Sequence, residues 1–344
     1  MKKAFRNAAI AAASLGLLAA ASPAHAGKDL DAIKARGQLI CGVGPSSAGF
    51  YLLGSDGKWS GIDVDVCRAI AAAILGDSEK VKYVPASAQQ RFQQVQSGEV
   101  DILSRTTTWT LTRDTSLGLD FGHITYYDGQ GFLVAKKLGV KSAKELNGAT
   151  VCVQPGTTTE LNLADYFRAN KMTFKSVVIE NRDEVEQAFY SGRCDVYTND
   201  ASGLASSRAT RSPKPDDYII LPDLISKEPL APAFRHGDNQ FGDIVRWAVY
   251  AMLEAEEFGI TSKNVDEMKA KSDNPAIKRL LGVTPGMGKA LGVDEDWAFR
   301  IIKQVGNYGE SFERNMGAGS ALKLERGLNR LWTQGGLQYA PPVR

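Results

Sequence analysis

The chain has little of what most catalytic and metal sites use. It contains three histidines and four cysteines in 344 residues, and no two cysteines form a C-x-x-C pair. The Gly-x-Ser-x-Gly and His-Glu-x-x-His patterns of hydrolases and zinc proteases are also missing. These gaps argue against a metal centre and an activated nucleophile, although a carboxylate could still act as a base. No cofactor is expected.

The chain also lacks an excess of charge. Residues 1–26 hold three of the 41 basic residues and none of the 39 acidic ones, so the remainder carries 38 basic against 39 acidic residues. Nucleic-acid binding needs a basic stripe, and a near-neutral chain argues against it.

Long apolar runs are confined to the N-terminus. Lys2, Lys3 and Arg6 precede an apolar run from Ala8 to Ala21, and Ala24-His25-Ala26 follows it. A basic region, an apolar region too short to span a bilayer and a small-x-small motif together predict a signal peptide at residues 1–26. We expect an exported protein that is not membrane-embedded and whose mature chain begins at Gly27.

Four cysteines in an exported chain make disulfides possible, and they allow three pairings. Pairing within each half, Cys41 with Cys67 and Cys152 with Cys194, closes the shorter loops and is favoured. Metal binding is the rival interpretation, but only His123 and His236 remain after residue 26.

The pattern of apolar residues predicts an α/β fold. Strands at Gln38–Val43, Val81–Pro85 and from Gly98 onward alternate with helices that include Val66–Ile74 and Phe92–Gly98. This order implies a mainly parallel sheet with its loops along one edge. A similar cycle starts again at Gly148 and closes at Asp200. Two lobes with a cleft between their loop edges follow from this repetition, and helices dominate after Pro229.

We therefore expect two lobes in the roughly 318 residues after the signal peptide, which exceed one typical core. Residues 27–132 and 240–344 would form lobe 1 with a C-terminal extension, and residues 133–239 lobe 2.

The segment from Asp101 to Arg113 is the most informative in the chain. A strand end leads into the run Ser104-Arg-Thr-Thr-Thr-Trp-Thr, and Thr110 is typical of an N-cap. Arg113 would then lie in the first helical turn, where a cation opposes the helix dipole unless it shares an anion with the free amides. The segment predicts a seat for a small carboxylate, and a solvated arginine is the alternative.

Two further segments would face this seat from the second lobe. In Pro155-Gly-Thr-Thr-Thr-Glu, Thr157 and Glu160 fit a capping box, which leaves Thr158 and Thr159 free to point into the cleft. Asp200 ends a strand, where helix capping is the alternative role. Opposite Arg113 it would complete a pair suited to a zwitterion: a cation for a carboxylate and a carboxylate for an ammonium group.

These residues resemble a known family. Trp59-Ser-Gly-Ile-Asp-Val-Asp-Val, the Thr106–Arg113 segment, Gly156-Thr-Thr and Asp195–Asp200 resemble the periplasmic amino-acid-binding proteins of ABC importers, solute-binding protein family 3. Ser226-Lys-Glu-Pro-Leu-Ala-Pro, Gly306-Asn-Tyr-Gly-Glu and the Leu331–Arg344 ending are similar to the general L-amino-acid-binding branch. The resemblance covers nearly all of the chain after residue 26 and implies a two-lobed periplasmic-binding-protein fold of type II.

The resemblance also implies roles for individual residues. Arg113, Thr106 and Thr108 would hold the α-carboxylate with help from Thr158, and Asp200 would hold the α-ammonium group. The family usually has a Pro-aromatic step in its first loop, whereas this chain has Gly49-Phe50-Tyr51. Phe50 is the aromatic residue expected to cover the ligand. Two extra cations, Arg91 and Arg105, would favour acidic or amide side chains, and solvated surface charge is the alternative for both.

The function implied is capture of free L-amino acids in the periplasm and their delivery to the membrane permease of an ABC importer. A monomer is expected, because a hinge must open and close freely. The alternatives on the same fold are an exported enzyme similar to cyclohexadienyl dehydratase and a chemosensory binding module. We expect no enzymatic activity.

Overall fold

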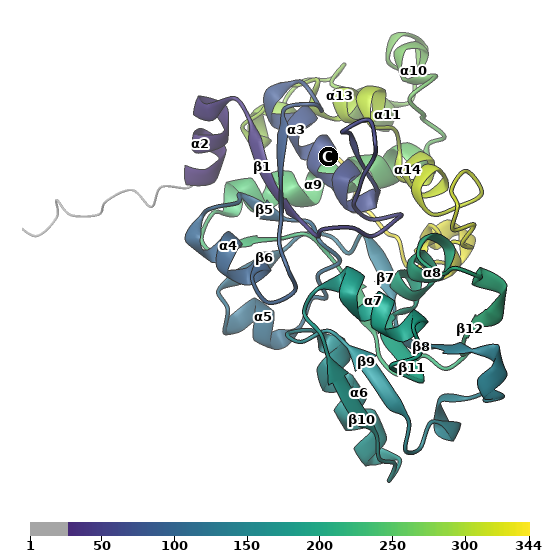
Figure 1. Cartoon of the computed structure of the whole chain (residues 1–344). Helices are drawn as coiled ribbons and strands as arrows, with labels where there is room; N and C mark the ends of the chain where they lie inside the picture. The colour runs from purple at the N-terminus through teal and green to yellow at the C-terminus, as the bar shows by residue number, and fades with distance from the viewer. Residues whose placement is uncertain (1–26) are drawn as a thin grey trace, which may run out of the picture.

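The computed structural model describes residues 27–344, and the predicted signal peptide at residues 1–26 lies outside the described residues. Two lobes, each built on a five-stranded sheet, lie against each other (Figure 1). None of the helices in the described part is long and apolar enough to cross a membrane.

The first sheet has the strand order β4-β1-β5-β14-β6. The pairs β1–β4 and β1–β5 are parallel, and β14 is antiparallel to both β5 and β6. Its strands are β1 (Leu39–Val43), β4 (Val81–Pro85), β5 (Ile102–Leu103), β6 (Leu119–Phe121) and β14 (Ala233–Arg235). A short hairpin, β2 (Leu52–Leu53) with β3 (Trp59–Ser60), lies beside it.

The second sheet has the strand order β10-β9-β11-β8-β12. Its first three strands are parallel, and β8 runs antiparallel to both of its neighbours. The strands are β8 (Gln130–Ala135), β9 (Thr150–Val153), β10 (Lys175–Val178), β11 (Val196–Asp200) and β12 (Tyr218–Ile220). Both sheets are therefore mixed, with a parallel part that matches the predicted alternation of strands and helices.

The helices of the first lobe form its large core. Helices α3, α9 and α13 pack on one another, and their apolar faces include Ile70, Val249 and Ile301, each at most 1 % exposed. The helices of this lobe are α2 (Lys28–Arg36), α3 (Ile62–Leu75), α4 (Arg91–Ser97), α5 (Leu111–Thr115), α9 (Asn239–Glu257), α10 (Val265–Lys271), α11 (Pro275–Leu280), α12 (Met287–Leu291), α13 (Trp297–Gln304) and α14 (Tyr308–Asn315).

The second lobe is thinner, with helices on both faces of its sheet (Figure 1). Successive residues of β8 point to opposite faces. Phe132 packs in the cluster that contains Phe167 of α6 (Thr158–Ala169), whereas Leu133 packs in the cluster that contains Val185 of α7 and Leu204 of α8. The other two helices are α7 (Arg182–Tyr190) and α8 (Ala201–Thr210). Both faces are apolar, as a sheet buried on two sides requires.

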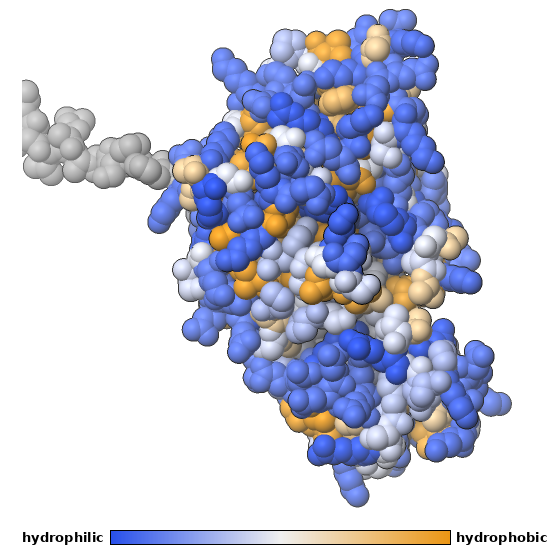
Figure 2. Space-filling model, turned by 45° about the horizontal axis from the view of Figure 1, so that its top comes forward, coloured by the Kyte–Doolittle hydropathy of each residue, from blue (hydrophilic) through white to orange (hydrophobic). Residues whose placement is uncertain are grey.

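The two lobes are connected by a pair of antiparallel strands. The chain leaves the first sheet through β7 (Tyr126–Asp128) and returns through β13 (Glu228–Leu230), and these strands pair with each other. The strand β14 at 233–235 lies in the first sheet, although the sequence analysis assigned residues 133–239 to lobe 2. The strand β8 of the second sheet begins at Gln130, three residues before the predicted start of lobe 2. In the space-filling view, polar residues dominate the visible face and hydrophobic residues gather in a band across its middle (Figure 2).

Two disulfides lie within the lobes. Cys41 on β1 bonds to Cys67 on α3, and Cys152 on β9 bonds to Cys194, two residues before β11. Each joins elements that are neighbours in the same lobe, so the favoured pairing is confirmed. No free cysteine remains in the described part of the chain.

Candidate functional site

A cavity of about 430 Å³ lies between the lobes, where the loops after the parallel strands meet. Seven of its lining residues come from the second lobe and six from the first. They are Tyr51, Ala88, Arg91, Arg105, Thr106, Thr108, Gln154, Thr157, Thr158, Thr159, Arg182, Asn199 and Asp200. Most of them are polar or charged, so the cavity suits a small polar ligand rather than an apolar one.

Several contacts cross the cleft around this cavity. Ser87 Oγ donates to Glu180 Oε1 at 2.6 Å, and Arg211 Nη2 donates to Ser46 Oγ at 3.2 Å. Arg91 Nη2 lies 3.5 Å from the carbonyl oxygen of Gly156. The structure is therefore one in which the lobes are closed on each other.

The segment after β5 has the predicted local geometry. The hydroxyl of Thr110 accepts a hydrogen bond from the amide of Arg113 at 3.3 Å and so caps α5. Thr106 has a φ of 41°, an unfavourable conformation for a residue with a Cβ, and Asp63 Oδ2 accepts its amide hydrogen at 2.8 Å. Burial raises the pKa of Asp63 to about 6, against the bonds from Thr106 and Ser104. A strained, anchored backbone fixes this wall of the cavity.

Arg113 is buried beside the cavity but is not one of the residues that line it. Its Nη1 donates to the carbonyl oxygen of Thr108 at 2.8 Å, and its guanidinium group lies 5.0 Å from the ring centroid of Phe92. Burial lowers the pKa of Arg113 to about 10, although the carboxylates of Glu228 and Asp200 oppose this. Within residues 27–344, Arg113 forms no ion pair.

Arg91 and Arg105, like Arg113, are buried arginines without an ion pair among residues 27–344. They are 3 % and 7 % exposed, both line the cavity, and neither forms an ion pair within the described part of the chain. Burial lowers the pKa of each; Arg105 and Arg113 lower that of Arg91 further. Solvated surface charge, the alternative for these two residues, does not fit such burial. A buried cation without a protein counter-ion needs an anion from elsewhere.

Asp200 does not cap α8, because its side chain makes no capping hydrogen bond. Asp128 caps the start of α8 instead: its Oδ2 accepts hydrogen bonds from the amide of Ser202 at 3.3 Å and from the Ser202 hydroxyl. Asp200 is thus left to line the cavity. Burial and the nearby carboxylates of Asp128 and Glu228 raise its pKa well above the ordinary value. A cation at this position would relieve that repulsion.

The two predicted threonines of the second lobe differ in their contacts. Thr157 caps α6 by accepting the amide of Glu160 at 3.1 Å, but the reciprocal half of the predicted capping box does not form, because Glu160 Oε2 accepts the amide of Gly156 instead. The Thr159 hydroxyl donates to Thr157 Oγ1 at 2.7 Å, whereas the Thr158 hydroxyl points to the first lobe, 3.4 Å from Thr108 Oγ1. Thr158 therefore belongs to the contact between the lobes.

Glu228 is a central residue that the sequence reasoning did not single out. It is 1 % exposed on β13, and its Oε2 accepts hydrogen bonds from the hydroxyls of Thr108 and Thr158 at 2.6 and 2.8 Å. Its Oε1 accepts from Asn162 Nδ2 at 2.8 Å and from the Ser226 hydroxyl. No local motif marks such a carboxylate, since its partners lie up to 120 residues away in the sequence.

The aromatic residue at the cavity is Tyr51 rather than Phe50. Phe50 is 2 % exposed and packs edge-on against Tyr126 in the core, with 5.3 Å between ring centroids. Tyr51 lines the cavity, and its hydroxyl lies 3.3 Å from Thr106 Oγ1. A Cβ at Gly44 would lie 2.3 Å from the Tyr51 ring, so this glycine makes room for the aromatic side chain.

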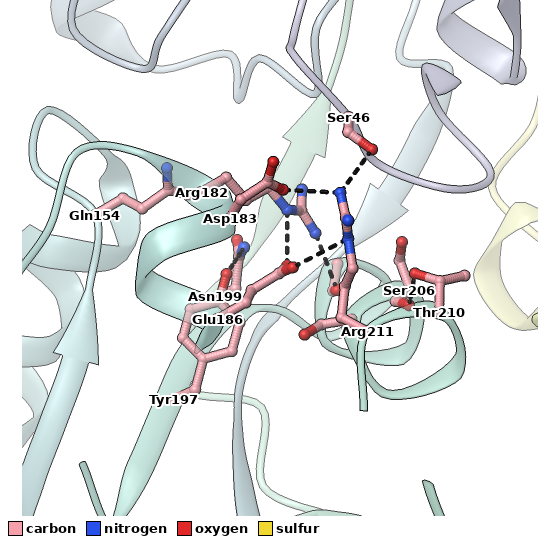
Figure 3. Close-up of polar contacts among 12 residues, drawn as sticks. Ser46, Gln154, Arg182, Asp183, Glu186, Tyr197, Asn199, Ser206, Thr210 and Arg211 are labelled. Carbon is pink, nitrogen blue, oxygen red and sulfur yellow. Dashed lines mark hydrogen bonds and ion pairs between the residues drawn. The ribbon is translucent and has the colours of Figure 1, made fainter. Parts of the chain in front are cut away.

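The start of α7 places Arg182 at the cavity. Arg182 Nε donates to Glu186 Oε1 at 2.9 Å, and Nη2 donates to the carbonyl oxygen of Gly203 at 3.2 Å (Figure 3). Burial alone would lower the pKa of Arg182, but Glu186 raises it above the ordinary value. Arg182 is a further site residue that the sequence did not reveal.

Comparison with known proteins identifies the family. The model of the bacterial extracellular solute-binding proteins, family 3, matches residues 39–264. The chain belongs to this family. The solved structure of a cysteine-binding protein from Campylobacter jejuni is 26 % identical, with a TM-score of 0.59 over 71 % of this chain and 95 % of that one. Our chain thus has the type II periplasmic-binding-protein fold.

Relatives in this family match along the whole chain. The general L-amino acid-binding periplasmic protein AapJ of Rhizobium johnstonii is 57 % identical over 346 residues, with all of both chains covered. The glutamate/glutamine/aspartate/asparagine-binding protein BztA of Rhodobacter capsulatus is 57 % identical over 96 % of this chain and 98 % of its own. A periplasmic binding protein from Brucella ovis with glutathione bound is 57 % identical, with a TM-score of 0.89 over 92 % of this chain and 99 % of that one.

Proposed function

We propose that this protein is the periplasmic amino-acid-binding component of an ABC transporter. It captures free L-amino acids in the cleft between its lobes and delivers them to the membrane permease. Full-length similarity to two amino-acid-binding proteins supports the substrate class. These relatives are binding proteins and not enzymes, so we assign no catalytic activity to the chain.

One observation carries the proposal. Three buried arginines without ion pairs in the described chain, Arg91, Arg105 and Arg113, lie on the first-lobe side of the cleft, and Asp200 faces them from the second lobe. An amino acid supplies a carboxylate for the arginines and an ammonium group for the aspartate. Both charges lose water when the lobes close, and each then meets a partner of opposite sign.

We assign the ligand contacts accordingly. Arg113, Thr106 and Thr108 hold the α-carboxylate with help from Thr158, and Asp200 holds the ammonium group. Because the hydroxyls of Thr108 and Thr158 donate to Glu228, these two residues contribute their backbone amides. Thr159 supports this wall. Arg91 and Tyr51 bound the space for the ligand side chain, and Tyr51 takes the covering role first expected of Phe50.

The same proposal divides the chain at the β7–β13 strand pair. The first lobe includes β14 and every helix after it, and the second lobe runs from β8 to the residues before β13. Closure then bends the two crossover strands, and the protein works as a monomer.

Native mass spectrometry of the protein as purified tests the function. A bound mass equal to one amino acid, removed by partial unfolding and restored by adding that amino acid, is the expected result. Glutathione belongs in the same panel, because the Brucella ovis relative holds it. Incubation with an amino-acid mixture should yield no product; a product would favour an enzyme.

A further inference from the structure

Two arginines from opposite lobes lie together at one end of the cleft. Arg105 follows β5 in the first lobe, and Arg182 begins α7 in the second. Both line the inner cavity, and both also line an adjoining outer pocket of about 760 Å³. Gln154 is the third residue that the two cavities share. The shared lining makes the outer pocket an extension of the ligand cavity.

The hydrogen bonds of these arginines leave donors free. Arg105 Nε donates to the carbonyl oxygen of Ala86 at 3.1 Å, and its two terminal nitrogens have no hydrogen-bond partner within residues 27–344. Arg182 uses Nε for Glu186 and Nη2 for Gly203, and its Nη1 has no partner in the same part of the chain. A guanidinium group offers five donors in a fixed fork, so several remain for a ligand.

Carboxylates also lie near the pair, because Glu180 and Glu184 line the outer pocket, but neither forms an ion pair with Arg105 or Arg182 among the described residues. Arg105 is 7 % exposed and forms no ion pair among the described residues. Glu186 pairs with Arg182 and also lies 3.8 Å from Arg211 Nε, so one carboxylate serves two cations (Figure 3). Burial lowers the pKa of Arg105, and repulsion from the guanidinium group of Arg182 lowers it further, although Tyr51, Asp63 and Asp200 oppose this. An anion placed between them would offset this repulsion in a site with little water.

We propose that Arg105 and Arg182 form a second anion subsite, which binds a carboxylate at the far end of the ligand. The inference rests on the proposed function, in which the Arg113 segment takes the first carboxylate. The ligand class is then an amino acid whose side chain ends in a carboxylate. Two sources carry this group: a free dicarboxylic amino acid, or a γ-glutamyl peptide long enough to reach the outer pocket.

Closure would complete the subsite, because each lobe supplies one arginine. A ligand carboxylate that bridges Arg105 and Arg182 stabilises the closed form directly, whereas an apolar side chain leaves the two cations facing each other. The subsite therefore determines which amino acids bind more tightly than others, whereas the contacts to the α-carboxylate and the ammonium group determine whether an amino acid binds at all.

Calorimetry with three ligands tests the subsite. L-Glutamate and L-norvaline have side chains of similar length and differ in the terminal carboxylate, and glutathione represents the longer source. We expect the wild-type protein to bind glutamate more tightly than norvaline. Arg105→Gln and Arg182→Gln should each weaken glutamate binding about 10- to 100-fold and change norvaline binding less than about threefold.

Arg211→Gln is the matched control. Arg211 pairs with Asp183 at 2.7 Å and contacts Glu186 in the same network, but it lines neither cavity. It should leave the glutamate-to-norvaline ratio unchanged. Arg105→Lys and Arg182→Lys keep the charge and serve if a glutamine variant fails to fold, and each should retain part of the preference.

Other outcomes would overturn the inference. A glutamate-to-norvaline ratio that is the same in the wild type and in the arginine variants would show that the pair does not contact the side-chain carboxylate. If the arginine variants lose glutathione binding but bind glutamate as tightly as the wild type, the pair contacts a carboxylate of the longer peptide, and a free dicarboxylic amino acid is refuted as its ligand. A wild-type protein that binds none of the three ligands would contradict the proposed function itself, a result distinct from equal binding of glutamate and norvaline.

Discussion

The hydroxyl of Thr108 lies 2.6 Å from Oε2 of Glu228, between the first lobe and the strand that crosses from the second. The same oxygen accepts a hydrogen bond from Thr158, a residue of the second lobe, at 2.8 Å. One buried carboxylate oxygen thus joins three separate parts of the fold. The two threonines expected at the ligand carboxylate do converge on a carboxylate, and that carboxylate belongs to the protein.

Glu228→Gln is expected to lower the free energy of unfolding by about 1–3 kcal/mol. An amide nitrogen would replace one oxygen and face donors where Glu228 now accepts four hydrogen bonds. Urea denaturation measures the change. Glu99→Gln, at an exposed position, is the matched control and should have almost no effect. Equal stability of the two variants would contradict the central role assigned to Glu228.

Arg113→Ala and Asp200→Asn should each weaken the binding of every accepted amino acid by about 2–5 kcal/mol, because each leaves one end of the zwitterion without its partner. Calorimetry with glutamate, glutamine, leucine and histidine provides the measurement. Arg168→Ala removes a cation of the same type at an exposed position and should leave all affinities unchanged. Unchanged binding of the whole panel by Arg113→Ala would mean that the carboxylate seat is misplaced.

Ligand binding should release protons. The pKa of Asp200 is raised by burial and by Asp128 and Glu228, so Asp200 is partly protonated at a pH where an ordinary aspartate is ionised. An ammonium group favours the ionised form, lowers this pKa and expels the proton. Affinity should therefore rise with pH until Asp200 is ionised in the free protein.

Calorimetry in buffers with different ionisation enthalpies measures this release directly. The observed binding enthalpy should vary with the buffer for the wild-type protein. For any binding that Asp200→Asn retains, this variation should be smaller. Identical enthalpies in phosphate and Tris would show that Asp200 is already ionised before the ligand arrives.

Each disulfide should stabilise the protein by constraining its unfolded chain. The sequence separations of 26 and 42 residues correspond to about 3.5–4 kcal/mol each in the chain-entropy model. Replacing either pair with serine should lower the free energy of unfolding by up to this amount and leave ligand selectivity unchanged. Peptide mapping without reduction checks the pairing, and a peptide that links Cys67 to Cys152 would refute it.

The sequence predicted those features of the fold and site that depend on local chemistry. Thr110 and Thr157 were predictable as N-caps, because capping depends on residues within three positions. Strand alternation and cysteine spacing likewise pointed to two lobes with internal disulfides.

Features set by packing between distant segments were not predictable. Glu228 and Arg182 acquire their roles from partners in other elements. The choice between Phe50 and Tyr51 depends on the space beside Gly44, which no local pattern encodes. The capping role considered for Asp200 falls to Asp128, because β7 passes close to the start of α8.

The contacts across the cleft lie at different distances from the antiparallel pair β7–β13, the two-stranded ribbon that connects the lobes. Glu228 lies on the ribbon itself, whereas the Ser46–Arg211 contact joins the first loop of one lobe to the end of α8 in the other. Rotation about the ribbon moves nearby atoms little and distant atoms much. A pair of fluorophores placed at positions 46 and 211 would therefore report lobe opening with greater amplitude than a pair beside Thr108 and Thr158.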